Sequence, residues 1–163
     1  MFGFSRTAKR SVRLQPDREN QLEVSQVRRR LQAAIAASRE RAERRRQQAA
    51  EADSAYDRFL TQVAAPLARQ VANALQSEGY SFTVSTPGRG LRLALDRGRD
   101  DFIELALVTD GDVPTVVGRT RRTRGSRTLE DERPIKAGAT PDQVGEDDLL
   151  DFFVSALEPW LER

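Results

Sequence analysis

The sequence predicts an α+β fold with a long N-terminal helix, a four- to five-stranded antiparallel β-meander and a C-terminal amphipathic helix. Apolar residues recur at helical spacing from residue 24 to residue 71, the apolar period changes to two after Gly79, and a helical pattern returns after residue 140. Hydrophobic residues make up 38% of the 163 positions. They are concentrated after residue 55, which suits one domain with an appendage.

Three segments are expected along the chain. Residues 1–19 form a flexible basic segment, because they lack a sustained period and contain Pro16. Residues 20–55 form a projecting helical arm rich in Arg and Ala, and residues 56–163 form a compact α+β domain. The first fifty positions carry 13 basic and 5 acidic residues, whereas the rest carry 14 basic and 20 acidic ones. The net charge of +2 therefore conceals a basic arm joined to an acidic body.

The long helix has recognisable start and stop signals. It is expected to begin at Asp17 or at the capping box Asn20–Glu23. It should end at about Glu78, because Gly79 supplies a left-handed position and Tyr80 the apolar residue of a Schellman stop.

The apolar stripe of this helix falls within an arc of about 80° when residues are placed 100° apart. Its members are Val24, Val27, Leu31, Ile35, Ala42, Ala49, Tyr56, Leu60, Val63, Leu67 and Val71, with Ser38 and Arg45 as polar members. From Tyr56 onward the large side chains can dock the helix on a sheet. Pro66 removes a backbone hydrogen bond, so we expect a kink or a break between Gln62 and Pro66.

Between Ile35 and Tyr56 the stripe offers mainly alanine methyl groups, which bury little surface. One interpretation is a close, weak coiled coil with a second copy. The other is an isolated helix, stabilised by Ala and Arg propensity and by pairs such as Glu40 with Arg44.

Alternating apolar residues after Gly79 predict the meander. The expected strands cover residues 80–85, 91–96, 102–108 and 113–120. Residues 128–136 are compatible with a fifth strand at an edge, where the missing donor of Pro134 is tolerated.

The last helix is expected to start at Thr140–Gln143, with Thr as cap, Pro at the first position and Gln at the capping-box position. Its apolar face comprises Leu149, Leu150, Phe153, Ala156, Leu157, Trp160 and Leu161, and its acidic face comprises Asp147, Asp148, Asp151, Glu158 and Glu162. We expect the apolar face to cover the sheet, and Pro159 to distort the last turn.

The chain contains no Cys and no His, which excludes disulfides, most zinc sites and catalytic triads built on imidazole. The carboxylate pairs Asp100–Asp101, Asp110 with Asp112 and Asp147–Asp148 lie in turns or near a helix start, where acidic residues have local roles. We expect no enzyme, cofactor or metal. The sequence shows no transmembrane segment or secretory signal, so a cytoplasmic location is expected.

Two groups of arginines are the candidate binding residues for a partner or a polyanion. They are Arg28, Arg29, Arg30, Arg44, Arg45 and Arg46 on the arm, and Arg119, Arg121, Arg122, Arg124 and Arg127 in a hairpin tip over residues 118–127. Guanidinium groups suit phosphates. However, the arm arginines surround the helix, the tip has no aromatic residue for stacking bases, and the acidic C-terminal helix of this or a neighbouring copy could complement the tip.

We therefore expect a non-catalytic interaction or scaffold protein whose basic arm engages a second copy or another macromolecule. The alternative is a nucleic-acid-binding accessory protein that uses the Arg-rich helix and residues 119–127. The two hypotheses differ in the salt dependence that they predict.

Overall fold

The computed structural model describes residues 23–97 and 100–162 of the chain. The expected basic segment 1–19 and the helix start at Asp17 or Asn20 lie outside these residues. The chain divides into two units, with the boundary between Ala42 and Glu43.

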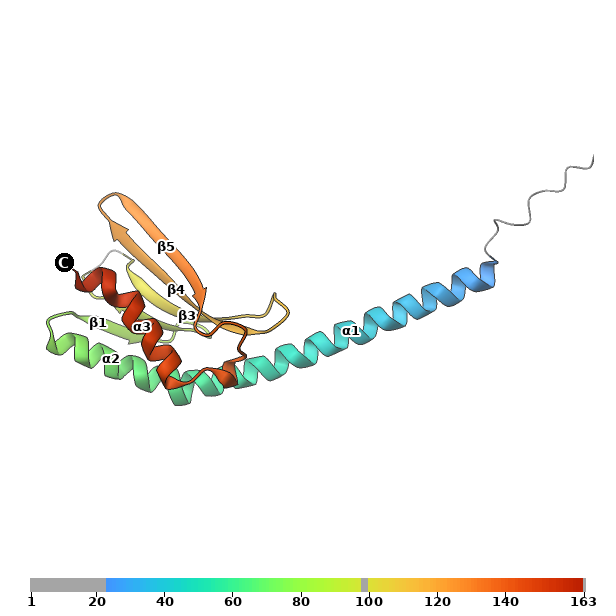
Figure 1. Cartoon of the computed structure of the whole chain (residues 1–163), viewed down its shortest axis with the longest axis horizontal. Coiled ribbons are helices and arrows are strands. Elements are labelled where there is room, and N and C mark those ends of the chain that lie inside the picture. The colour runs from blue at the N-terminus through green and yellow to red at the C-terminus, as the bar shows by residue number, and fades with distance from the viewer. Residues whose placement is uncertain (1–22, 98–99, 163) are drawn as a thin grey trace, which may run out of the picture. The chain divides into compact units, whose positions relative to one another are not determined.

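The predicted α+β fold is confirmed, with five strands in the sheet (Figure 1). The elements are α1 (Val24–Phe59), a π-helical turn (Leu60–Ala64), α2 (Ala65–Ser77), β1 (Phe82–Ser85), β2 (Leu91–Leu95), β3 (Phe102–Val108), β4 (Thr115–Arg124), β5 (Arg127–Pro134), a 3₁₀ turn (Pro141–Gln143) and α3 (Glu146–Leu161). The sheet is an antiparallel meander in the order β1-β2-β3-β4-β5. Its fifth strand lies at an edge, as predicted.

The interruption that was predicted before Pro66 takes the form of the π turn. The N–H of Ala65 donates to the carbonyl of Leu60, five residues back rather than four. Pro66 then occupies the first turn of α2, where its missing N–H is tolerated. The π turn therefore adds one residue to the helical path just ahead of the proline.

This extra residue changes which side of α2 faces the core. The sequence pattern predicted Val63, Leu67 and Val71 on the buried face. The buried residues are instead Ala64, Ala68 and Ala72, each one position later, and the larger side chains are half-buried beside them. Small side chains thus face the core, which lets the helix backbone approach the strands closely.

The end of α2 is confirmed as a Schellman motif. Gly79 has a φ of +91°, and the N–H of Tyr80 donates to the carbonyl of Leu75 at 2.8 Å. The N–H of Gly79 donates to the carbonyl of Gln76 at 3.1 Å. These two bonds satisfy carbonyl groups that the helix end would otherwise leave without partners.

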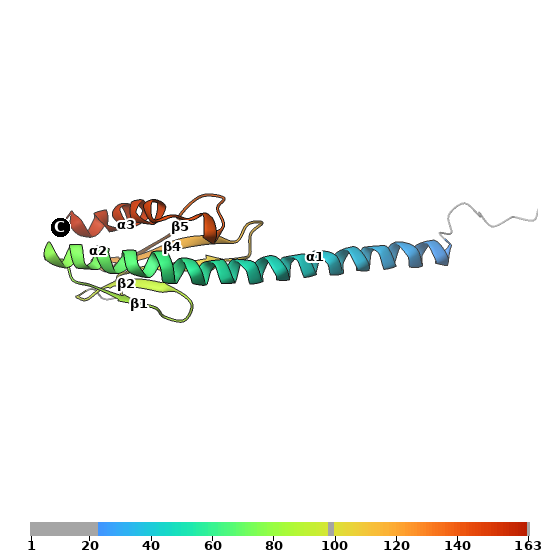
Figure 2. The same ribbon diagram turned by 90° about the horizontal axis from the view of Figure 1, so that it is seen from below.

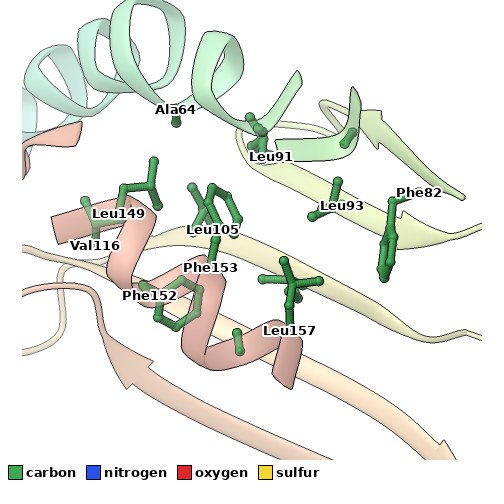
Figure 3. Close-up of a cluster of buried hydrophobic side chains, with 14 of the residues drawn as sticks. Ala64, Phe82, Leu91, Leu93, Leu105, Val116, Leu149, Phe152, Phe153 and Leu157 are labelled. Atoms are coloured by element: carbon green, nitrogen blue, oxygen red, sulfur yellow. The ribbon is translucent and has the colours of Figure 1, made fainter. Parts of the chain in front are cut away.

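Helices α2 and α3 lie side by side over one face of the sheet (Figures 1 and 2). Their buried residues form a single cluster with Leu91, Leu93 and Leu105 of the sheet. Figure 3 shows these leucines facing Phe153 and Leu157 of α3. This cluster holds the domain together through the burial of apolar surface.

The C-terminal part of α1 is attached to the sheet by polar contacts as well. The hydroxyl of Tyr56 donates to the carbonyl of Leu105 at 3.0 Å. Arg89, in the loop between β1 and β2, forms ion pairs with Asp53 and Asp57 at 3.2 Å each. The hydrogen bond to Asp57, followed by the one to Asp53, raises the pKa of Arg89.

The start of α3 differs from the prediction. The capping box is present, because the N–H of Thr140 donates to Oε1 of Gln143 at 3.0 Å, but it closes only the 3₁₀ turn. Val144 and Gly145 are extended, so α3 begins at Glu146. The helix then continues through Pro159 to Leu161.

The predicted apolar face of α3 was wrong at two positions and incomplete at a third. Leu150 and Leu161 are exposed, whereas Phe152 is buried. The ring of Phe152 lies against Gly118 of β4, where the missing side chain leaves room for it. Its place in the core depends on this distant glycine, which the pattern of α3 alone does not reveal.

Candidate functional site

The N-terminal part of α1 presents an exposed apolar stripe, which we call the α1 ridge. It consists of Val24, Val27, Leu31 and Ile35, whose exposed fractions are 78%, 40%, 58% and 50%. At 100° per residue these four side chains lie within about 80° of one another. No residue from 23 to 51 is buried. The ridge is therefore a contiguous apolar surface in contact with water.

Arginines flank the α1 ridge on both sides. The helical spacing places Arg28 and Arg39 along one edge and Arg30 and Arg41 along the other. Arg29 points to the opposite side of the helix by the same spacing. The ridge thus combines an apolar centre with basic margins.

The other arginines that the sequence predicted on the arm do not lie beside the α1 ridge. Arg44 and Arg46 lie on α1 after the boundary between the two units, and Arg46 pairs with Glu43 at 3.3 Å. Arg28, Arg29, Arg30 and Arg45 form no ion pair with any residue that the structure describes. The candidate arginines of α1 therefore surround the helix rather than form one cationic face.

The expectation of a hairpin tip over residues 118–127 was wrong over most of its length. Strand β4 continues to Arg124, and β5 begins at Arg127, so the turn consists of Gly125 and Ser126. Because side chains alternate along a strand, the five arginines do not share one surface. They form two sets, on opposite faces of the hairpin.

The first set, Arg119 and Arg121, lies on the sheet face opposite the helices. Arg119 pairs with Glu132, and Arg121 approaches Glu130 at 3.4 Å. The hydrogen bond with Glu132 raises the pKa of Arg119. Their acidic complement is thus strand β5, not the C-terminal helix that the sequence suggested.

A row of alternating charges crosses this open face. Each strand from β2 to β5 contributes one residue to this row, and neighbours in the row lie directly opposite each other: Arg92, Glu104, Arg119 and Glu132. Arg92 pairs with Glu104 at 3.3 Å, and its guanidinium lies 4.2 Å from the centre of the Phe102 ring. Partners within the sheet neutralise these charges, so the open face has little capacity for a polyanion.

The second set comprises Arg122, Arg124 and Arg127, on the face of the hairpin toward α3. Arg124 lies directly opposite Arg127, next to the turn. None of the three forms an ion pair with the described residues. Arg122 lines a groove of about 230 Å³ with Leu129, Ser155 and other residues of the hairpin and α3.

Two of the three predicted carboxylate pairs each contain one residue with a structural role, Asp101 and Asp148. Asp101 is buried; one of its carboxylate oxygens accepts from the indole N–H of Trp160 at 3.0 Å and the other from the N–H of Thr123 at 2.7 Å. Asp148 accepts from the N–H of Gly145 at 2.9 Å, and this bond, with nearby Lys136, lowers its pKa. Among residues 23–97 and 100–162, no three acidic side chains gather as a metal site would require.

A cavity of about 480 Å³ lies between α1, the loop between β3 and β4, and the turn at 140–142. Its charged lining consists of Glu51, Arg58, Asp112 and Asp142. The hydroxyl of Thr140 donates to Asp142 at 2.7 Å and lowers the pKa of that carboxyl group. The charged groups that line this cavity are mixed in sign.

The exposed side of α3 carries an apolar strip that sequence reasoning missed, beside acidic residues that it predicted. Leu150, Val154 and Leu161 are 40%, 54% and 40% exposed and fall within about 40° of one another on the helix. Asp147, Asp151 and Glu158 follow along one margin of this strip. We call these six residues the α3 acidic face. The sequence contains the apolar residues of this strip, but they lie directly beside the buried apolar residues of α3. The two stripes therefore look like one broad apolar face in the sequence.

Comparisons with protein-family models, curated proteins and solved structures found no match for this chain. In the described part of the chain, no helix has both the length and the apolar character that crossing a membrane requires.

Proposed function

We propose that this protein is a non-catalytic interaction protein whose α1 ridge is the contact surface for a second copy or another macromolecule. One observation carries this proposal. Large apolar side chains, including Leu31 and Ile35, remain exposed at helical spacing, while Tyr56 and Phe59 of the same helix are buried in the domain. A contiguous apolar stripe with charged margins is a common form of helical recognition surface.

Site-specific photocrosslinking tests this function even while the partner is unidentified. The full chain carries benzoylphenylalanine at Leu31 or, as a matched control, at Ala33, about 200° around the helix. Both residues are exposed, so neither replacement disturbs a core. We expect Leu31 to form a crosslink in expressing cells that excess native chain competes away. Equal yields from both positions, or no product from Leu31, would exclude the α1 ridge as the contact surface.

A nucleic-acid-binding accessory function is the second candidate. It is favoured by Arg122, Arg124 and Arg127, which have no acidic partner within the described residues. A mobility-shift assay on mixed DNA and RNA should then show binding that falls steeply between about 50 and 200 mM salt. Replacing the three arginines by Gln should weaken that binding, and no shift at the lower salt would exclude this function.

A further inference from the structure

Two helix surfaces account for most of the large apolar side chains that remain exposed. Nine such side chains are exposed in the described part of the chain. Four belong to the α1 ridge and three to the α3 acidic face, while Val113 and Leu129 stand singly. Single exposed apolar residues need no explanation, but two stripes on helices suggest two halves of a contact.

We propose that the α1 ridge of one copy docks on the α3 acidic face of a second copy. This inference rests on the proposed function and identifies the partner as the chain itself. It also assigns a place on that partner, which the proposed function leaves open.

The two surfaces match in length. Val24 and Ile35 are eleven residues apart, and so are Leu150 and Leu161. At 1.5 Å per residue, each apolar stripe is about 16 Å long. Each stripe is also narrow, so the two helices can align their apolar side chains along a common line.

The margins of the two surfaces are complementary in charge. Residues 23–42 contain five arginines and two glutamates. Helix α3 contains five acidic residues and no basic one. Contact between unlike surfaces brings Arg28 or Arg30 toward Asp151 or Glu158, which steers association.

Pairing of like surfaces is disfavoured for the same reason. Two α1 ridges would bring the arginines of both copies together, and two α3 faces would do the same with carboxylates. The contact therefore joins different patches of the two copies. A reciprocal exchange gives a two-fold dimer with two identical contacts, and a one-way exchange continues into a ring or a chain.

Mixing two complementary variants of the full chain tests this geometry. The ridge variant is Leu31→Gln with Ile35→Gln, and the face variant is Leu150→Gln with Val154→Gln. All four residues are exposed, and glutamine is neutral and compatible with a helix, so the domain should fold in both. The matched control is Ala33→Gln with Ala36→Gln, on the opposite side of α1.

Sedimentation velocity over a range of concentrations should show that the native chain and the control associate. Each variant alone should lose affinity by about 100-fold or more, because two apolar side chains leave the contact. An equimolar mixture of the two variants should form a 1:1 complex. The intact ridge of one then meets the intact face of the other, and this complex should be weaker than a native pair with two contacts.

The ways in which this inference can fail are distinguishable. If the face variant associates like the native chain while the ridge variant does not, the docking site on α3 is wrong and the proposed function stands. If the mixture stays monomeric although the native chain associates, the contact between the α1 ridge and the α3 acidic face is wrong. If the native chain is monomeric throughout, this inference is wrong, and crosslinking from Leu31 decides the proposed function separately.

Discussion

Replacing Gly118 by alanine should destabilise the domain by forcing Phe152 out of its position. A Cβ added to Gly118 would lie 2.0 Å from Cζ and 2.5 and 2.6 Å from the two Cε atoms of the ring. Carbon atoms normally approach to about 3.5 Å, so the ring or the strand must move by roughly 1.5 Å. Phe152 is held between α3 and β4, with the guanidinium of Arg133 5.2 Å from its centre. We therefore expect a loss near the upper end of the usual range for overpacking, about 3 kcal/mol.

Urea unfolding followed by the fluorescence of Trp160 measures this loss, because Trp160 is the single tryptophan and is buried in α3. With a slope near 2 kcal/mol per molar urea, a loss of 3 kcal/mol lowers the midpoint by about 1.5 M. Gly111→Ala is the matched control. Its new methyl group would meet only the carbonyl of Val113 at 3.9 Å, so a change below about 0.5 kcal/mol is expected.

A double variant isolates the contact itself. If Phe152 is shortened to leucine, the added methyl group at Gly118 no longer meets a ring. The two losses should then be less than additive, with a coupling of about 0.5–3 kcal/mol. Strict additivity, or a Gly118→Ala variant as stable as the native chain, would show that the ring does not occupy the space above the glycine.

Three further changes test other contacts. Asp101→Asn replaces one carboxylate oxygen with an NH₂ group, so either Trp160 or Thr123 loses its acceptor and urea unfolding should show a loss of about 1–3 kcal/mol. Tyr56→Phe removes the hydrogen bond to the carbonyl of Leu105, and a loss of about 0.5–1.5 kcal/mol is expected by the same assay. Burial raises the pKa of the Tyr56 phenol. The stabilisation from the neutral phenol should therefore be complete below about pH 10 and decline at higher pH. Tyr56→Phe should remove that decline. The hydrogen bond from Gly145 lowers the pKa of Asp148, so this carboxylate should stabilise the fold at pH values above its ordinary pKa near 3.9. That stabilisation should be lost as the pH falls through the lower pKa of the folded state. An NMR titration with Asp148→Asn as reference can follow this change.

Local signals predicted the parts of the fold that depend on neighbouring residues. Gly79 and Tyr80 identified the end of α2, because a Schellman motif involves only residues within one turn. Pro66 indicated an interruption for the same reason. The period-two alternation correctly predicted the meander, since each strand carries its own apolar face.

Contacts between distant residues determined the rest. The arginines after Gly118 read as a loop because they are polar, yet Glu130 and Glu132 lie across from Arg121 and Arg119 and extend the strand. The side of α2 that is buried depends on the π turn, because the turn moves the buried positions along the sequence by one residue. Neither feature is visible in a window of sequence around the residues concerned.

The candidate site was only partly predictable. The exposed stripe of α1 followed from its helical spacing and from the lack of large apolar residues in the following turns. The acidic residues of the α3 acidic face were predicted, but its apolar strip was missed because Leu150 and Leu161 were assigned to the core. A sequence alone does not say which of two adjacent apolar stripes is buried, since that choice depends on what packs against the helix.

The free edge of strand β5 is a place where another molecule could add a strand. Strand β5 is one of the two edge strands of the sheet, and all of its residues are exposed. Such an edge can add strands from other molecules without limit. Here five of the eight residues of β5 are charged, and Pro134 at its end lacks an N–H donor. Charged side chains and proline on an edge strand disfavour the addition of further strands, so we expect specific contacts to form through helical surfaces instead.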